Sequence, residues 1–147
     1  MNLENVKTYP NVSEAVGNIS KKEKWEKAMD GTLEELKSYE KILFAVPIKK
    51  ITITEHTQGT LILARDKECL VTLTDKRLLL VSKNFGDRVF SDKFTTTILL
   101  DEMDAVNDHV DGKAKELIIK SKQRVYQFVD TSQNLPTLRD KLLALFP

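Results

Sequence analysis

The sequence predicts a mainly β fold with helices at both ends: a small antiparallel barrel or sandwich closed by a C-terminal helix. Three observations predict it. Short apolar runs separated by turn residues recur between residues 41 and 129. The runs at 69–73 and 78–82 are almost entirely apolar and are joined by a polar turn, as in a buried hairpin. Near the C-terminus, leucines recur at the spacing of one helix face.

The composition is that of a soluble protein with one domain. The chain has 147 residues, of which 41% are hydrophobic and 31% are charged. No apolar run approaches the roughly 20 residues that a spanning helix needs, and the N-terminus lacks the apolar core of a signal peptide. We therefore expect a cytoplasmic protein, in which the single cysteine, Cys69, is a buried and reduced thiol. The net charge of +1 argues against nucleic acid as a partner.

The first 40 residues read as an arm followed by two helices. Val16, Ile19 and Trp25 fall on one face of a predicted helix over residues 13–29, with Ser13 as its N-cap and Gly31 at its end. A second short helix then begins at Thr32, because Glu35 stands three residues later as in a capping box. Whether these helices pack on the rest of the chain is left open.

From residue 41 the period changes to that of strands. Residues 41–48 predict a strand that Pro47 restricts to an edge, an end or a bend. Residues 51–54 and 60–65 are further strand candidates, and Asp66 with Lys67 predicts a turn into the central hairpin. The course of the chain from 49 to 66 stays open between one long bent strand and a separate hairpin.

The second half continues as strands and ends in a helix. Segments 88–90 and 94–100 are strand-like, 104–110 is a short strand, and 116–120 with 124–129 predicts another hairpin. The last helix begins after Thr131 or Ser132. It presents an apolar stripe that predicts a lid on the sheet: Leu135, Leu138, Leu142 and Leu145.

This order of elements resembles the pleckstrin-homology-like (PH-like) barrel, in which seven antiparallel strands are followed by one amphipathic helix. Residues 73–81, LTDKRLLLV, resemble the turn between the second and third strands in bacterial PH domains of the YokE-like family. Residues 39–43 are similar to the lead-in before the first strand of that family. The resemblance implies a binding or scaffolding module over residues 33–147, preceded by an N-terminal arm and helical extension at 1–32.

The sequence offers little indication of a catalytic or metal-binding site. His56 and His109 are far apart in the sequence and lack the spacing of a zinc site. The acidic group Asp101, Glu102 and Asp104 lacks the spaced loop of a calcium site and reads as a solvated turn. We therefore expect no enzymatic activity, no metal and no cofactor.

Asp75 and Arg77 are interpreted as structural. We expect the aspartate to bond the backbone of its own turn, and the guanidinium to be paired on the outside of the barrel.

Two surfaces are candidates for binding. Residues 41–100 carry ten basic against six acidic residues, and membrane-binding PH domains hold anionic lipid headgroups with cations in comparable regions. The candidate cations are Lys49, Lys50, Lys83, Arg88 and Lys93. The second surface is a candidate protein interface on the N-terminal helices, formed by Trp25, Met29, Leu33 and Leu36. Protein association, with the same or another chain, is the favoured function, and an anionic membrane surface is the alternative.

Overall fold

The chain folds around one antiparallel sheet of seven strands in the order β4-β3-β2-β1-β7-β6-β5. The computed structural model describes residues 3–4, 6–17, 19–89 and 92–146. The predicted mainly β class with a C-terminal helix is confirmed. The strands are β1 (Ile42–His56), β2 (Thr60–Thr74), β3 (Arg77–Ser82), β4 (Thr95–Leu99), β5 (Met103–Asp111), β6 (Ala114–Ser121) and β7 (Arg124–Asp130).

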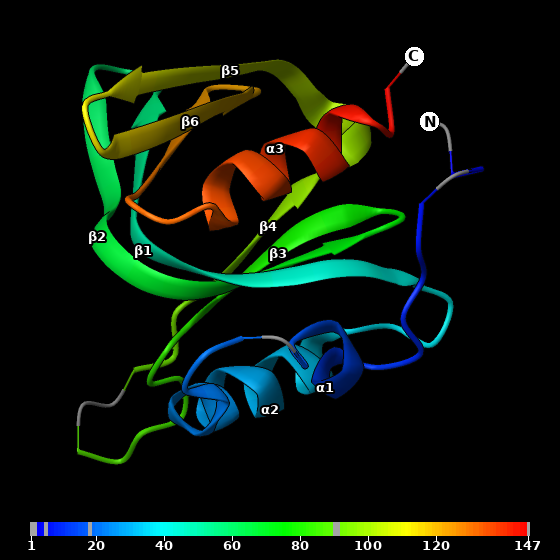
Figure 1. Cartoon of the computed structure of the whole chain (residues 1–147). Helices are drawn as coiled ribbons and strands as arrows, with labels where there is room; N and C mark the ends of the chain where they lie inside the picture. The colour runs from blue at the N-terminus through cyan, green and yellow to red at the C-terminus, as the bar shows by residue number, and fades with distance from the viewer. Residues whose placement is uncertain (1–2, 5, 18, 90–91, 147) are drawn as a thin grey trace.

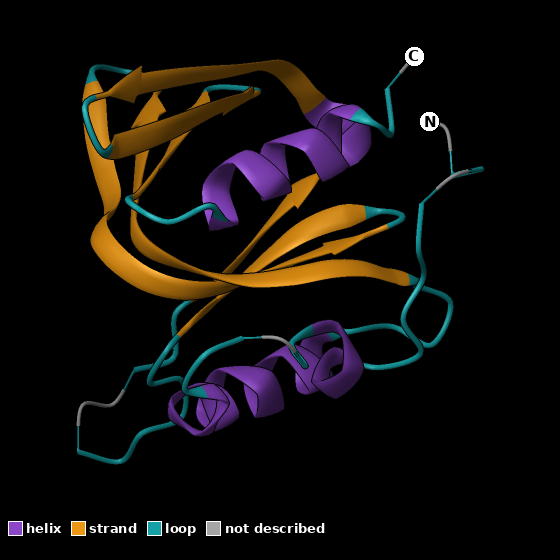
Figure 2. Cartoon of the chain, viewed as in Figure 1, coloured by secondary structure: helices purple, strands orange, loops and turns teal. Residues whose placement is uncertain are grey.

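The sheet bends on itself because β1 and β2 are long and belong to both of its halves. β1 pairs with the second half of β2 at its start and with β7 over residues 50–55. The short helix η2 (Leu100–Glu102) connects β4 to β5. Helix α3 (Asn134–Leu143) lies between the two halves and closes the space between them, as Figures 1 and 2 show. The predicted lid is therefore present.

The segment whose course the sequence left open is one bent hairpin. Residues 41–48 and 51–54, predicted as two strands, form the single strand β1, and the predicted turn at Asp66 is wrong because β2 continues through it. Irregular pairing between Ile48 and Thr54 absorbs the bend. At this place Asp66 has a φ of +48°, and its N–H donates to Thr52 Oγ1 at 3.2 Å. Pro47 lies where β1 is not yet paired with β7, consistent with its predicted confinement to an edge or bend.

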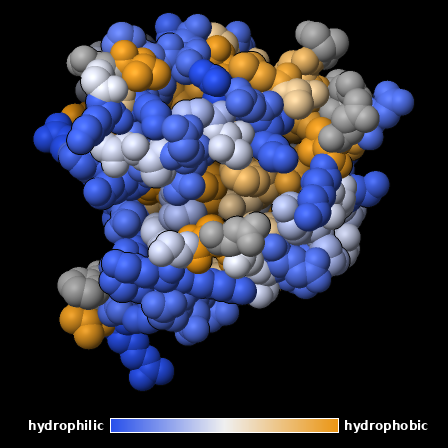
Figure 3. Space-filling model, in the orientation of Figure 1, coloured by the Kyte–Doolittle hydropathy of each residue, from blue (hydrophilic) through white to orange (hydrophobic). Residues whose placement is uncertain are grey.

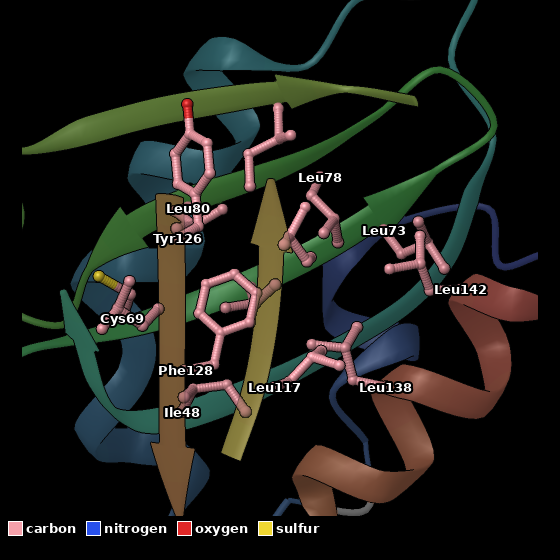
Figure 4. Packing of buried hydrophobic residues seen from close by; sticks show 14 of the residues in the cluster. Ile48, Cys69, Leu73, Leu78, Leu80, Leu117, Tyr126, Phe128, Leu138 and Leu142 are labelled. Atoms are coloured by element: carbon pink, nitrogen blue, oxygen red, sulfur yellow. The ribbon is translucent and has the colours of Figure 1, made fainter. Parts of the chain in front are cut away.

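The hairpin of β2 and β3 is buried on both faces, which explains why its sequence is nearly continuous in apolar residues. One face points into the space under α3, where Leu138 lies near Leu117 and Leu142 near Leu73 around the central Phe128 (Figure 4). The opposite face packs against the N-terminal helices. This outer cluster consists of Val12, Val16, Trp25, Ala28, Ile42, Ala45, Leu70, Leu79 and Val81.

The N-terminal helices are arranged differently from the prediction. They are α1 (Val12–Ala15), the 3-10 turn η1 (Lys22–Trp25) and α2 (Glu26–Glu35). The cap of α1 is Asn11, whose Oδ1 accepts the Glu14 N–H at 2.8 Å. Gly31 and Thr32 both lie inside α2, and the Thr32 hydroxyl donates to Ala28 O of the same helix at 2.7 Å instead of capping a new one. Helix α2 therefore runs across the predicted division between residues 32 and 33.

Gly31 is required for close packing rather than for a helix end. A Cβ at this position would collide with the ring of Phe85, which comes from the connection between β3 and β4. In that connection Arg88 and Val89 form a loop instead of the predicted strand, and the predicted Phe90 lies outside the described residues. None of the described helices is long and apolar enough to cross a membrane.

Candidate functional site

The five predicted cations lie on two stretches of the chain. Lys49 and Lys50 are exposed on β1 at the bulge after Ile48, in a strand rather than a loop. Lys83, Arg88 and Lys93 belong to the connection between β3 and β4. The pairing of β1, β2 and β3 places Glu68 between the β1 lysines and Lys83, whose Nζ lies 3.4 Å from Glu68 Oε1. An acidic side chain thus separates the two groups of cations.

Carboxylates also lie within the connection itself. Asp87 forms an ion pair with Lys27 of α2 and accepts the N–H of Val89 at 2.8 Å. Asp92 accepts the N–H of Phe94 at 3.0 Å and lies 3.8 Å from the Lys67 ammonium. These groups offset much of the positive charge, and they hold a loop on which Val89 is 84% exposed.

The predicted protein interface is largely occupied by the chain's own sheet. Trp25 is only 6% exposed within the outer cluster, and the Lys83 ammonium lies 5.0 Å from the centroid of its ring. Met29 and Leu36 are half-buried against the same cluster. Of the four residues, only Leu33 is exposed, at 54%. Figure 3 shows hydrophilic side chains over most of the N-terminal helices on the face that it displays.

His56 and two residues of the acidic group, Glu102 and Asp104, have local polar contacts. The ring nitrogens of His56 lie 3.2 and 3.3 Å from the hydroxyls of Thr54 and Thr60 at the tip of the β1–β2 hairpin. Glu102 forms an ion pair with Lys122 at 3.0 Å, and Asp104 accepts the N–H of Lys122 at 2.9 Å. The acidic residues therefore join η2 and β5 to the β6–β7 turn. Among the described residues, no cluster of three or more histidine, cysteine or acidic side chains could hold a metal ion.

The predicted external pairing of Arg77 is wrong, because its guanidinium is turned inward. Nη2 lies 2.7 Å from Glu40 Oε1, and the two side chains are 12% and 2% exposed. The guanidinium also donates to Thr97 Oγ1 at 3.0 Å and to Glu35 O at 2.7 Å. Burial raises the pKa of Glu40, but hydrogen bonds from Arg77, Thr74 and Lys37 outweigh burial and leave the pKa below its ordinary value. Through these bonds, Arg77 of β3 connects to the end of α2 at Glu35 and to β4 at Thr97.

The turn before Arg77 is also bonded differently from the prediction. The hydroxyl of Thr74, not the carboxylate of Asp75, accepts the turn's N–H groups, from Lys76 at 3.1 Å and from Arg77 at 3.0 Å. Asp75 instead accepts the N–H of Lys41 at 2.9 Å, which fixes the start of β1.

An open polar hollow of about 550 Å³ lies at the end of the β1–β2 and β6–β7 hairpins. Its charged residues form two ion pairs, Arg124 with Glu55 at 3.1 Å and Lys122 with Glu102. Hydrogen bonds to Tyr126 and Glu55 raise the pKa of Arg124. With two cations and two carboxylates, these lining side chains carry no excess charge with which to select an anionic ligand. The hollow is lined by Glu55, Thr97, Glu102, Ser121, Lys122, Gln123, Arg124 and Tyr126.

A feature that the sequence did not reveal is an apolar run on the free edge of β2. Leu61, Ile62 and Leu63 are 57%, 45% and 37% exposed. β2 pairs with β3 only from Cys69 onward, so among the described residues β1 is the sole strand beside residues 60–67. A run of this kind is typical of a buried strand, and only the long-range pairing of β2 shows that it is uncovered.

Comparison with known proteins supports the fold. No protein family model matches the chain, and no curated protein matches it. Among solved structures, the chain is similar to the "Vps36 N-terminal PH domain" at 19% sequence identity, with a TM-score of 0.50 over 75% of this chain and 82% of that one. The strand order, the bent sheet and the helix between its halves agree with this likeness, and the chain therefore has a PH-like fold.

Proposed function

We propose that this chain is a non-enzymatic contact module whose main role is protein association. The observation that carries the proposal is the exposed run Leu61–Leu63 on the free edge of β2. An exposed strand edge presents unpaired N–H and C=O groups to which another chain can add a strand, and the adjacent apolar side chains supply contact area. This surface replaces the predicted helix interface, since Trp25 is buried in its own fold.

The sequence around the run favours contact over solvation. Residues 57–64, TQGTLILA, contain no aspartate, glutamate, lysine or arginine, although 31% of the chain is charged. Strand edges that avoid association commonly carry charges or proline at such positions. Charged residues begin only at Arg65, beyond the exposed apolar side chains.

Site-specific photocrosslinking tests this proposal. We expect a photoreactive amino acid at Ile62 to form adducts with a protein chain, in the purified protein or in extract of the cells from which the chain derives. The matched control is the same substitution at Val110, which is also apolar, 58% exposed and on a strand at the edge of the sheet. If position 62 yields no adduct, or no more than position 110, protein association through β2 is rejected.

A second candidate function is contact with an anionic membrane surface. It is favoured by Val89, which is 84% exposed in the β3–β4 connection beside Arg88 and near Lys93 in sequence. An apolar tip flanked by cations suits the boundary between headgroups and acyl chains. Each cation near such a surface contributes about 1 kcal/mol.

Co-sedimentation with vesicles tests the membrane candidate. We expect binding to vesicles containing phosphatidylserine at low salt, and its loss at high salt or on pure phosphatidylcholine. Charge reversal by Arg88→Glu with Lys93→Glu should weaken it at least about tenfold. Lys113→Glu, on the exposed β5–β6 turn, is the control and should bind as the wild type does. Absence of binding at low salt would remove this candidate.

We also propose a domain division, a family and a location for the chain. We assign the PH-like module to residues 33–147 and an extension to residues 1–32. Helix α2 crosses this division, and the N-terminal helices pack onto β1, β2 and β3, so the extension is an integral part of the fold. The YokE-like resemblance of the turn at residues 73–81 supports membership of that bacterial family. A cytoplasmic location is supported by Cys69, a single buried thiol.

A further inference from the structure

The backbone of the β2 edge has a defined alternation of bonded and free groups. The N–H of His56 donates to Gln123 O at 2.7 Å, so His56 directs its backbone groups toward β7. In an antiparallel ladder successive residues direct these groups to opposite sides. Glu55 therefore bonds its partner Leu61 on β2, and the groups of Thr60 and Ile62 point away from β1 toward the free edge.

The side chains along this edge are symmetric in sequence over the three exposed residues Leu61, Ile62 and Leu63. Leu61 and Leu63 stand on either side of Ile62. If two such strands lie antiparallel about Ile62, the two isoleucines face each other and Leu61 of each copy faces Leu63 of the other. The two isoleucines then form the hydrogen-bonded pair that the outward backbone groups of Ile62 require. No charged residue lies within this paired segment, so no like charges oppose each other in it.

We propose that this edge binds a second copy of the chain, by antiparallel pairing of the two β2 strands about Ile62. The inference rests on the proposed function and names its partner. A two-fold contact needs a surface that is complementary to itself, and the symmetric run Leu61–Leu63 provides one. Each copy covers the apolar side chains that the other exposes, and each gives the free N–H and C=O of the other a partner.

The same geometry sets the strength of the contact. The irregular pairing between Ile62 and Ala64 and the charged residues from Arg65 onward limit the regular edge to a few residues. The interface is therefore at the small end of the range for protein complexes, and we expect weak, reversible association. The dimer then forms at high concentration and separates on dilution.

Sedimentation velocity over a series of protein concentrations tests the pairing. We expect a concentration-dependent shift from monomer to dimer in the full chain. Ile62→Lys should abolish the shift, because it places two ammonium groups opposite each other at the two-fold axis. Val110→Lys, at another exposed apolar position on an edge strand, should leave the shift unchanged. A chain that is monomeric throughout, or a dimer that Ile62→Lys does not affect, would overturn the pairing.

A disulfide across the axis tests the register. The Cα atoms of a hydrogen-bonded antiparallel pair lie about 5.5 Å apart, within the roughly 4.4 to 6.8 Å that a disulfide spans. Mild oxidation should therefore link Ile62→Cys chains into covalent dimers, and Val110→Cys chains much more slowly. The native Cys69 should not react, because it is buried and burial raises its pKa to about 12. Equal rates for the two variants would contradict the register.

The two proposals fail in different ways. Adducts at Ile62 of twice the chain's mass support the second copy. If Ile62 captures only chains of another mass and the purified protein stays monomeric, protein association stands and self-pairing is wrong. If it captures no protein, both proposals fail.

Discussion

Ending the chain after Asp130 is expected to abolish cooperative unfolding. The deletion removes Leu135, Leu138, Leu142 and Leu145, which are between 0% and 2% exposed in the inner core. Burying four leucines contributes about 6 to 12 kcal/mol as an upper estimate, against a total stability of about 5 to 15 kcal/mol for a domain. The truncated chain should show a broad thermal transition in circular dichroism and should bind a hydrophobic dye. A sharp two-state melt would contradict this prediction.

Two substitutions within α3 show how much of the truncation's effect comes from lost packing of buried side chains and how much from removing the helix itself. Leu138→Ala empties a fully buried position and should cost about 2 to 5 kcal/mol of unfolding free energy. Leu143→Ala alters the same helix at a position that is 44% exposed, and should change stability by less than about 0.5 kcal/mol. Urea unfolding of both variants measures the difference. Equal losses would mean that helix formation, rather than burial against the sheet, accounts for the role of α3.

The sequence predicted those features of the fold that depend on local periodicity. The leucine spacing of α3 and the alternation of the hairpins were readable because each follows from neighbours within a few residues. Gly31 misled the prediction, because its close contact with Phe85 comes from a segment far along the chain. The bend of β1 and β2 was equally inaccessible, since it depends on bulges that only strand pairing reveals.

The candidate sites were less predictable than the fold for the same reason. Trp25 and Leu61 are both large apolar residues, and no local pattern distinguishes the one that is 6% exposed from the one that is 57% exposed. The cations around Lys83 were visible in the sequence, but Glu68, which lies between them and the β1 lysines, reaches that position through pairing of three strands. Whether a side chain is exposed, and whether its charge is neutralised, depends on how the strands of the whole sheet pair.

The ion pair of Arg77 with Glu40 is expected to contribute strongly to stability. Arg77→Met leaves a carboxylate that is 2% exposed without its cation, a change that should cost about 3 to 5 kcal/mol at pH 7. Arg124→Met is the matched control, because Arg124 and Glu55 are 40% and 27% exposed and such pairs contribute about 0 to 1 kcal/mol. Urea unfolding measures both losses, and similar values for the two would show that burial does not strengthen the pair.

The pH dependence of that loss identifies the unpaired carboxylate as its cause. In the wild type the pKa of Glu40 is lowered, so its contribution to stability is present above the unfolded pKa and is lost as the pH falls through the folded pKa. In Arg77→Met, burial remains and the bonds from the guanidinium are gone, so the pKa of Glu40 should rise and the group should protonate readily. The deficit of the variant should therefore shrink as the pH falls from 7 toward about 4. Replacing both partners, by Arg77→Met with Glu40→Leu, should recover most of the stability at pH 7, because no buried charge is left unpaired. A deficit that is constant with pH would instead assign the loss to the packing of the arginine stem and its bonds to Thr97 and Glu35.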